Sequence, residues 1–539
     1  MQGSRPAPDL ADRLAVLILA AVTIAAAFTF RDYGLGWDDY THSQYGNLLL
    51  ELYGSGFADV RALSFVNLYK YGGGFDMAAA LAGKVLPFDL FETRRLVGAA
   101  IGIIGLAASW RLARRLGGPV AGLSALALLA ACPLYQGHMF INAKDAPFAV
   151  AMIVLMLGAV RALEEYPQPS ARTIALFGIG LGAAFGSRVL AGLGAPEIAA
   201  GLGLLTAVEG KTLGWRAAVV RSGQFLWTLL PGFVLAYLIM GLLWPWGVLA
   251  PLNPFRALEY FDKFFEKPWQ ELYEGRLISV PDMPASYLPH LFVLKLPELM
   301  LALGFLGSIG ALIVLARRGT APGRRAGLLA LLLAVYLPIA IAMVTRPALY
   351  NGVRHFIFVV PPFAVLGGLA AHWLIERLRP HGRAALAGII ALFVIGLALP
   401  VVGMARLHPY EYTYFNSLAG GVRGAEDRYM LDYWGLAFKQ AAEALRDWVA
   451  ANTLQAPNGR RWVVAICGPQ AAAKVELGPQ FETTFDQKKS DFALALGTFY
   501  CRHLSAPIIA DITREGVSYA RAYDLRGRAK PDLLTVPPP

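Results

Sequence analysis

The chain has 539 residues, of which 56% are hydrophobic and only 16% are charged. A soluble protein of this size would carry roughly a quarter charged residues, so the composition excludes an ordinary soluble globular protein. The formal charge of +11 does not indicate nucleic-acid binding, because the basic residues cluster between apolar runs, as they do in cytoplasmic membrane loops. The sequence therefore predicts a polytopic α-helical membrane protein with no nucleic-acid partner.

Eleven apolar segments are candidates for membrane spans. They begin near Leu14, Leu96, Pro119, Ala146, Thr173, Val189, Phe225, Leu291, Leu328, Phe356 and Ala384. The second, third and fifth are short, and flanking arginines can extend from them to the interface. The first lacks a small-residue cleavage site, so we interpret it as a retained span and not as a removed signal peptide.

The distribution of Lys and Arg indicates the orientation of the spans, since cytoplasmic loops carry most of these residues. The loops expected in the cytoplasm contain Arg5, Arg13, Arg111, Arg114, Arg115, Arg161, Arg172, Lys211, Arg216, Arg221, Arg317, Arg318, Arg324, Arg325, Arg377, Arg379 and Arg383. The opposite short loops hold only Lys144, Arg188, Arg346 and Arg354. Eleven spans that start inside place the C-terminal region outside.

Two of the outward segments are long, at residues 31–95 and 250–290. In the first, the apolar spacing of residues 45–53 and 75–86 predicts helices that lie in the membrane interface. The second is rich in aromatic residues, Pro and charge, including the run Phe261 to Trp269. We interpret the second segment as an amphipathic lid at headgroup level.

After Met404 the long apolar runs end, so residues 1–404 are the expected membrane domain and residues 405–539 a small extracytoplasmic α/β domain. The spacing of residues 435–451 predicts a helix, and residues 461–466 and 491–496 are predicted strands. Cys467 and Cys501 both fall in this region, either as a disulfide or as two free thiols. Cys132 lies in an apolar run and is interpreted as inert core.

Two acidic sites lie just outside the spans. Asp38 and Asp39 follow the first apolar run, and Asp145 follows Asn142 and Lys144 between two later runs. Charges near the bilayer are costly and persist mainly where they have a function, so these sites suggest a membrane-embedded enzyme. The alternative is helix capping, by the Asp pair before a helix near residue 41 and by Asp145 before a span.

Lys144, Arg188, Arg346 and Arg354 lie on the outward side, where Lys and Arg are uncommon. Their presence there therefore calls for an explanation other than membrane topology. Phosphate binding is one explanation, because Arg and Lys match phosphate oxygens well. A lipid headgroup contact or a local ion pair is the other.

Several stretches, in their order and sidedness, resemble a GT-C glycosyltransferase of the glycosyltransferase family 39 type. Relatives of that type are the protein O-mannosyltransferases and the lipid A aminoarabinose transferases. The stretches are Trp37-Asp38-Asp39 after the first span, Lys70 at the place of a loop lysine, residues 138–148, Asn351 to Phe356 with Pro361-Pro362, residues 412–421 and residues 432–435. The resemblance covers about residues 13–445.

The sequence departs from this family at two points. The tyrosine that follows the acidic pair in the aminoarabinose transferases is His42 here, and no MIR-type domain is visible. The donor sugar, the acceptor and the prenyl chain length are therefore left open by the resemblance.

The resemblance implies a GT-C fold of about 11 transmembrane helices with the small C-terminal domain, in the bacterial inner membrane. It implies inverting transfer of a sugar from a polyprenyl-phosphate donor to a hydroxyl of a glycan, lipid or protein on the periplasmic face. No cofactor is required by this chemistry. A divalent metal held by His42, His138 and His355 is conceivable, but their spacings match no compact motif.

The resemblance also implies roles for single residues. Asp38 is the predicted general base, and Asp39 and Asp145 are the other catalytic candidates. The predicted ligands of the donor phosphate are Lys70, Arg354, Arg188, Arg346 and His355. The predicted acceptor or donor loop residues are His42 and Lys144.

Three other functions fit the composition. A transporter or flippase of lipid-linked sugar would also have many helices, but transporters tend to place their sites near the midplane and to contain internal repeats. The second alternative is an assembly protein whose tail binds partners. The third is an oligosaccharyl-type transferase with a different acceptor.

Overall fold

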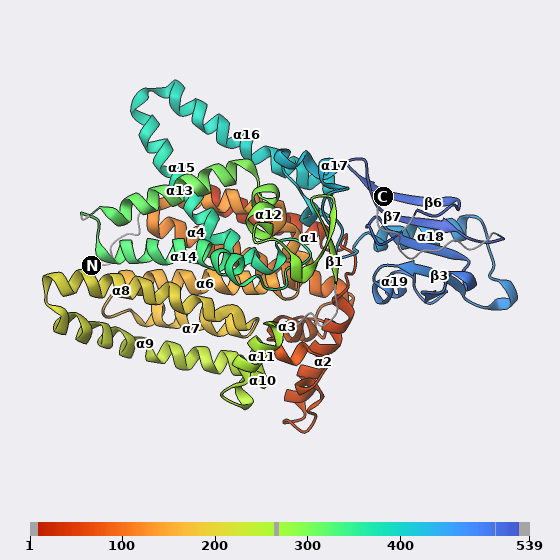
Figure 1. Ribbon diagram of the computed structural model, residues 1–539, viewed down its shortest axis with the longest axis horizontal. Helices are drawn as coiled ribbons and strands as arrows, with labels where there is room; N and C mark the ends of the chain where they lie inside the picture. Colours follow the sequence, from red (N-terminus) through yellow and green to blue (C-terminus); the bar gives the residue numbers. More distant parts are fainter. Residues whose placement is uncertain (1–8, 263–268, 318, 502, 528–539) are drawn as a thin grey trace.

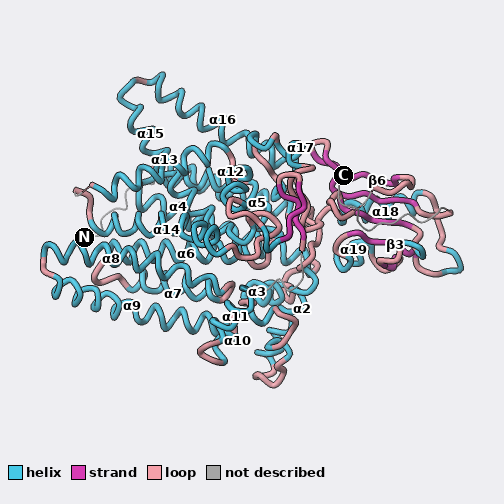
Figure 2. The backbone as a smooth tube through the Cα atoms, in the orientation of Figure 1, coloured by secondary structure: helices cyan, strands magenta, loops and turns pink. Residues whose placement is uncertain are grey.

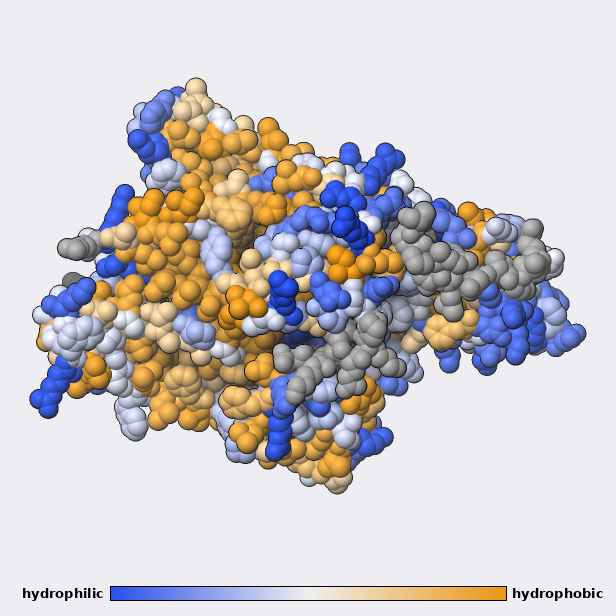
Figure 3. All heavy atoms as spheres, viewed as in Figure 1, coloured by the Kyte–Doolittle hydropathy of each residue, from blue (hydrophilic) through white to orange (hydrophobic). Residues whose placement is uncertain are grey.

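The structure is a computed structural model that describes residues 9–262, 269–317, 319–501 and 503–527. Long helices run side by side along its longest axis, and a small sheet lies beyond one end of them (Figures 1 and 2). On the face in view, apolar residues cover much of the helical part, and polar residues gather toward both ends of the molecule (Figure 3). This distribution is typical of a protein that crosses a bilayer.

Within the described residues, nine helical segments are long and apolar enough to cross a membrane, which confirms the predicted membrane protein. The helices in these segments are α1 (Leu10–Thr29), α4 (Leu90–Ala130), α6 (Asp145–Glu164), α8 (Gly194–Thr212), α9 (Trp215–Leu243), α13 (Glu298–Ala316), α14 (Pro322–Thr345), α15 (Val360–Leu378) and α16 (Arg383–Leu407). Short 3-10 turns extend α8 and α15, namely η3 (Val189–Leu193), η5 (Arg354–Val359) and η6 (Arg379–His381). Helix α7 (Ala171–Phe185) is apolar but shorter, so the count of eleven spans stays a prediction.

Helix α4 contains a reversal of the chain at Gly118, whose φ of 84° is costly for any residue with a side chain. The second arm packs back on the first, because a Cβ added to Gly122 would lie 2.8 Å from Cβ of Arg114. Helix α5 (Pro133–Ile141) continues alongside the first arm, where Met139 lies against Gly98 and Gly102. The turn that follows α5 therefore lies near the start of α4.

The long outer segments fold into short elements around this end of the bundle. The first forms α2 (Asp39–Gly54), η1 (Arg61–Leu63), η2 (Leu68–Lys70) and α3 (Gly74–Ala82), which include the two predicted helices. The second forms α10 (Pro245–Leu249), α11 (Asn253–Asp262), β1 (Gln270–Tyr273), β2 (Arg276–Ser279), η4 (Val280–Asp282) and α12 (Tyr287–Lys295). The antiparallel hairpin of β1 and β2 lies where the sequence predicts only a lid, and residues 263–268 of that lid are outside the described residues.

The chain after α16 begins with short turns and a long helix, namely η7 (Glu411–Thr413), η8 (Ser417–Ala419), α17 (Gly421–Ala425) and α18 (Phe438–Ala451). The sheet region that follows comprises η9 (Pro457–Gly459), β3 (Trp462–Cys467), α19 (Gln470–Leu477), β4 (Phe481–Thr484), η10 (Gln487–Lys489), β5 (Phe492–Leu496), β6 (Ile508–Arg514) and β7 (Val517–Asp524). The strand order is β4-β3-β5-β7-β6, with parallel pairs on both sides of β3 and antiparallel pairs on both sides of β7. The predicted α/β character, helix and two strands are confirmed.

The sheet and the helical bundle share one apolar core. A single cluster of buried side chains extends from Leu106 and Phe148 in the bundle to Val464 and Phe492 in the sheet. Polar contacts join the two parts as well, since Leu35 N donates to Oε1 of Glu476 on α19 over 3.2 Å. Burial of apolar surface is the main favourable term in such packing, so the sheet is held against the loop that follows α1.

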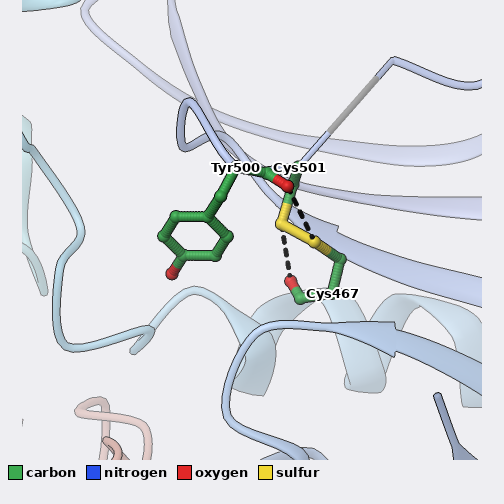
Figure 4. Close-up of a disulfide and its surroundings, with 3 residues drawn as sticks. All are labelled: Cys467, Tyr500 and Cys501. Carbon is green, nitrogen blue, oxygen red and sulfur yellow. Dashed lines mark hydrogen bonds between the residues drawn. A yellow bond between two sulfur atoms is a disulfide. The ribbon is translucent and has the colours of Figure 1, made fainter. Parts of the chain in front are cut away.

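Cys467 and Cys501 form a disulfide at one end of the sheet, which resolves the alternative left open by the sequence (Figure 4). The bridge joins the end of β3 to the segment between β5 and β6.

We expect replacement of both cysteines by alanine to lower the free energy of unfolding of the sheet by about 3–4 kcal/mol, because the bridge closes a 34-residue separation. Thermal unfolding of the purified protein measures the effect. A reductant should lower the melting temperature of the wild type but not that of the double variant. Two free thiols in non-reducing mass spectrometry of the wild type would contradict this assignment.

Candidate active site at the Asp38 cluster

Asp38 stands at the start of α2 with its carboxylate turned toward two cations. Its Oδ2 lies 3.1 Å from Nζ of Lys144 and 3.9 Å from Nη1 of Arg354. The Asp38 side chain is 38% exposed, whereas those of Lys144 and Arg354 are 12% and 6% exposed. It makes no capping hydrogen bond to the described residues of α2. The carboxylate of Asp38 is thus accessible to solvent, whereas the two cations that it contacts are buried.

The second acidic site lies beside the first. Asp145, at the start of α6, is buried and forms an ion pair with Arg188. Asn142 holds the turn: its Nδ2 donates to Asp145 over 2.9 Å, and its Oδ1 accepts from the backbone N–H groups of Lys144 and Asp145. Asp38, Lys144, Asp145, Arg188 and Arg354 are named the Asp38 cluster below.

Aromatic rings frame the cations of the cluster. Lys144 and Arg188 lie 5.1 and 5.6 Å from the ring centre of Tyr71. Arg354 lies 4.8 Å from the ring of Tyr350 and 4.9 Å from that of Trp434. Aromatic faces attract cations without neutralising their charge. Three cations therefore face two carboxylates, and the cluster keeps one positive charge.

The charges of the cluster sustain one another. Burial by itself would raise the pKa of Asp38, but Lys144 and then Arg354 hold that pKa well below its usual range. Burial would lower the pKa of Lys144, yet the carboxylate of Asp38 raises it above its usual value. Both groups are ionised at neutral pH. A carboxylate with such a low pKa is a weak base for as long as its cations stay in place.

A hairpin far from the cluster in sequence positions Arg354. The carboxylate of Glu271 on β1 accepts from the backbone N–H of Asn351 over 2.6 Å and from Tyr287 Oη over 2.6 Å. Gly352 N donates to the same carboxylate over 3.3 Å. These bonds fix the turn that leads into η5, which begins at Arg354.

A segment after the last span positions Asp38. Trp37 N donates to the carbonyl of Trp434 over 3.2 Å, and a Cβ added to Gly36 would lie 1.7 Å from Cδ1 of Trp434. The buried Asp432 carboxylate shapes this segment by accepting three backbone N–H groups, those of residues 435, 436 and 437. Trp434 thus packs against the turn before Asp38 and against Arg354 together.

Lys295 ties the same region to the bundle. It is buried, and its Nζ donates to the carbonyls of Tyr412 and Tyr414, both over 3.2 Å, and lies 4.1 Å from the ring centre of Phe415. A Cβ added to Gly352 would lie 3.9 Å from Lys295 Cε. The sequence analysis gave no role to residues 412–421. In the structure, Lys295 connects this run to the turn before Arg354.

Asp39 does not enter the cluster, although the sequence predicts it as catalytic. Its buried carboxylate accepts two hydrogen bonds from Arg95, over 2.8 and 2.6 Å, and one from Gly36 N over 2.8 Å. Arg95 also donates to the carbonyl of Gly34. The ion pair of Asp39 and Arg95 thus holds the turn before α2. Asp39 and Asp38 have different partners because adjacent residues at the start of a helix point in different directions.

Three other predicted residues also lie apart from the cluster. The ammonium of Lys70 lies 3.5 Å from the ring centre of Tyr260 on α11. Arg346 is exposed at the end of α14. His42 is buried against Asp76 of α3. His355 borders the cluster, since it follows Arg354 and its ring centre lies 5.0 Å from that of Tyr350.

Sequence reasoning misses several residues that the site needs. Arg94 and Arg95 are also basic residues on the outward side, like those singled out in the sequence analysis. Their position just before the second span could therefore have identified them. Tyr71 and Trp434 give no such signal, because aromatic residues are common at membrane interfaces.

In the described ranges, no three His, Cys, Asp or Glu side chains are close enough together to hold a metal ion. His42, His138 and His355 have separate surroundings: His138 Nε2 lies 3.1 Å from Tyr433 Oη, while His42 pairs with Asp76. Burial lowers the pKa of His138 to about 3, so it is neutral at physiological pH.

Comparison with known proteins tests the resemblance drawn from the sequence. Residues 80–231 match the model of the dolichyl-phosphate-mannose-protein mannosyltransferase family. Over this part of the chain, the predicted resemblance to GT-C glycosyltransferases is confirmed. The matched residues include Lys144, Asp145 and Arg188, whereas Asp38 and Arg354 lie outside them. A search of curated proteins found no match.

The solved structures show how far the fold extends. ArnT from Cupriavidus metallidurans in the apo state has 15% identity and a TM-score of 0.50, over 95% of this chain and 98% of that one. ArnT bound to undecaprenyl phosphate has 16% identity and a TM-score of 0.48, over 95% and 99%. The apo oligosaccharyltransferase of Archaeoglobus fulgidus has 12% identity and a TM-score of 0.49, over 84% of this chain, which spans 62% of its length. The match to apo ArnT, which extends over 95% of this chain, confirms the predicted GT-C fold.

We expect Arg95→Met to destabilise the protein by about 3–5 kcal/mol, because it leaves the buried Asp39 carboxylate without its partner. Thermal unfolding in detergent measures the loss. Arg61→Met is the matched control, since Arg61 pairs with Asp59 at an exposed site and its loss should change little. Equal melting temperatures for the two variants would contradict the structural role of Asp39.

The stability of the protein should rise with pH through Lys295. Burial lowers the pKa of Lys295 to about 7 from 10.5, so the unfolded chain binds the proton more tightly between these values. Unfolding thus becomes less favourable as pH rises from about 7 toward 10.5. We expect Lys295→Met to flatten the dependence of melting temperature on pH in this window. The exposed Lys84→Met should leave that dependence unchanged; an unaltered slope in Lys295→Met would contradict the prediction.

Proposed function

We propose that the chain is an inverting membrane glycosyltransferase, which moves a sugar from a polyprenyl-phosphate donor to an acceptor hydroxyl. One observation carries the proposal: the accessible carboxylate of Asp38 lies against buried cations, and the cluster as a whole keeps a net positive charge. A cluster with a net positive charge suits a phosphate group that gains negative charge as it leaves. The family match and the GT-C fold support the same chemistry.

In the proposed reaction, the acceptor oxygen attacks the anomeric carbon from the face opposite the phosphate, which inverts that centre. The C–O bond to the phosphate breaks, and its electron pair stays on the phosphate oxygen. Asp38 accepts the acceptor proton as general base. Lys144, Arg354 and Arg188 neutralise the departing phosphate, as cationic side chains do in phosphoryl sites. Each of these steps uses side chains alone, and independence of a metal stays a prediction.

The donor itself would activate Asp38. Its phosphate competes with Asp38 for Lys144 and Arg354, because both anions need the same cations. When these cations turn to the phosphate, the pKa of Asp38 rises toward its usual range and the carboxylate becomes a stronger base. Base strength would thus develop only when a donor is bound.

An apolar cavity beside η5 supports a lipid-linked donor. It has a volume of about 350 Å³ and lies among α12, α13, α14 and α15, with Val359 of η5 in its wall. A second apolar cavity of about 440 Å³ shares Phe305 and Tyr336 with the first and follows α13 and α14 further. We propose that the prenyl chain enters this groove with its phosphate at Arg354.

The proposed site faces the periplasm in a bacterial inner membrane. At the other end of the bundle, basic side chains pair with acids of neighbouring helices, as in Arg114 with Asp12 and Arg221 with Glu209. More basic residues gather on the cytoplasmic side in general. The disulfide supports an oxidising compartment for the sheet. Residues 1–404 would then be the membrane domain and residues 405–539 the periplasmic one.

The acceptor would be a hydroxyl of a glycan, a lipid or a protein, and the donor sugar is left to experiment. The transporter and flippase alternative receives no support from the comparisons, whose named relatives transfer sugars. No specific contact favours the assembly-protein alternative.

The deciding experiment measures binding and turnover separately in nanodiscs, with a panel of polyprenyl-phosphate sugars. We expect the wild type to bind one donor saturably. Arg354→Ala should lose that binding at least tenfold, because one buried charge-assisted contact is removed. Asp38→Asn should retain binding but lose turnover by about 10²–10⁴-fold, as expected for a general base.

Arg346→Ala is the matched control, because Arg346 is an outward arginine outside the Asp38 cluster and should behave as the wild type. Melting temperatures near that of the wild type are required for each variant. Near-normal turnover in Asp38→Asn would remove Asp38 as the base. Absence of binding across the panel, including bare polyprenyl phosphate, would overturn the proposed function itself.

A further inference from the structure

A groove lies between α16 and the chain that follows it, and is named the α16 groove below. Its volume is about 440 Å³, which is in the range of small-molecule pockets. One wall is a face of α16, and the other comes from residues 414–423 and from Glu515 in the turn between β6 and β7. In Figure 1, α16 leads to α17 beside the C-terminal sheet. The α16 groove shares no lining residue with the two apolar cavities near η5, so it is a separate site.

The groove face of α16 is apolar and open to the membrane. Ile395, Leu399 and Val402 recur on it at helical spacing, and all three are exposed. Of the 25 residues of α16, only Pro400 and Leu407 are buried, so this helix lies at the edge of the bundle. The open side of the α16 groove therefore faces membrane lipid.

The apolar face has the length of one lipid leaflet. From Ile395 to Arg406 the helix rises about 16 Å, because each residue adds about 1.5 Å. The hydrocarbon of a bilayer is about 30 Å thick, so one leaflet takes about 15 Å. An acyl chain that lies along α16 therefore brings its headgroup level with Arg406.

This leaflet is on the side of the Asp38 cluster. His408 directly follows α16, and its Nε2 lies 2.9 Å from Oδ2 of Asp32. Asp32 belongs to the loop that leads from α1 to Asp38. The polar end of the α16 groove and the Asp38 cluster are thus at the same end of the bundle.

Two arginines stand at the polar end of the groove. Arg406, whose side chain is 66% exposed, has its Nε 3.8 Å from Oε1 of Glu515, which is beyond hydrogen-bond distance. Nε of Arg423 donates to the backbone carbonyl of Glu515 over 2.8 Å, which positions the guanidinium without neutralising it. Glu426 is also near Arg423 but does not line the groove. Two arginines and one glutamate line the groove, so its lining carries a net positive charge.

We propose that the α16 groove binds one anionic phospholipid of the leaflet on the side of the Asp38 cluster. The phosphate lies between Arg406 and Arg423, because guanidinium groups hold phosphate oxygens by charge-assisted hydrogen bonds. An acyl chain lies along the apolar face of α16. The net positive charge selects anionic headgroups over zwitterionic ones. Lipid binding here goes beyond the proposed function and does not depend on sugar transfer.

The inner wall of the groove adjoins the segment that Lys295 connects to the turn before Arg354. Phe415 lines the groove, and its ring centre lies 4.1 Å from Nζ of Lys295. The ring of Tyr414 lies against α16, since a Cβ added to Gly403 would be 3.1 Å from its Cε2. A bound lipid packs on both rings. Because a ligand that binds only the folded state stabilises that state, lipid binding should raise the melting temperature.

The first test compares phosphatidylglycerol with phosphatidylcholine of identical acyl chains, by native mass spectrometry of the full-length protein in detergent. We expect the wild type to retain one phosphatidylglycerol at least tenfold more tightly than phosphatidylcholine. Arg406→Gln combined with Arg423→Gln should weaken phosphatidylglycerol binding at least tenfold and remove the preference, because the phosphate loses both cations. Arg276→Gln combined with Arg428→Gln is the matched control, since it removes two exposed charges outside the groove at the same end of the bundle.

The second test fills the groove without a change of charge. Val402→Trp places a large side chain on the groove face, and we expect it to abolish the rise in melting temperature that phosphatidylglycerol causes in the wild type. Val401→Trp is the matched control and should keep that rise. Val401 and Val402 are both 47% exposed, but of the two only Val402 lines the groove.

The outcomes separate the lipid site from other occupants. Equal affinities of the wild type for the two lipids, a comparison that needs no variant, would identify ordinary contact with bulk lipid and overturn the site. Phosphatidylglycerol lost in Arg354→Ala but kept in the Arg406 and Arg423 double variant would place the lipid in the proposed donor groove and also overturn it. A dimer that excludes the lipid and dissociates in Val402→Trp would assign the groove to a second copy of the chain.

Failure of the lipid site and failure of the proposed function are distinguishable. Phosphatidylglycerol binding that follows the groove variants, in a protein that binds no polyprenyl-phosphate sugar, would support the lipid site and refute only the proposed function. A wild type that transfers sugar but shows no preference for phosphatidylglycerol would refute only the lipid site.

Discussion

The attraction between Asp38 and the buried ammonium of Lys144 is the interaction on which the site depends. A cation excluded from water needs a counter-charge, and Asp38 is the partner that solvent can still reach. The same pairing keeps the carboxylate ionised and keeps it a weak base. In the proposed reaction, an incoming phosphate would replace Asp38 as the anion that faces the cations. Donor binding would then raise the strength of the base without any large movement.

The walls of the site come from segments that are far apart in the chain. The turn before α2, the turn before α6, the turn before η5 and the segment with Trp434 meet at one end of the bundle. Buried hydrogen bonds fix these segments. Some come from another element, as Glu271 fixes the turn before Arg354, and some come from the segment itself, as Asn142 fixes the turn before α6. The C-terminal region therefore completes the site as well as capping it. A catalytic geometry held this way depends on the packing of the whole outer end.

Local pattern predicts much of this protein because the bilayer imposes strong constraints. Long apolar runs, the asymmetry of Lys and Arg, and acidic residues just outside the spans predict the membrane fold and point to Asp38, Lys144, Asp145, Arg188 and Arg354. Asp39 shows the limit of this reasoning. Its neighbour in sequence is Asp38, yet a helix start turns the two carboxylates in different directions, one to Arg95 and one to Lys144.

The sequence by itself determined the class of protein, the α/β character of its tail and a short list of charged residues, because hydropathy and charge act locally. The tertiary structure decided which of those charges meet. It placed Lys70 against Tyr260, Trp434 against Arg354, and His42 against Asp76. Such contacts depend on how helices reverse and pack, as at Gly118, and packing is a property of the whole chain that no single segment specifies.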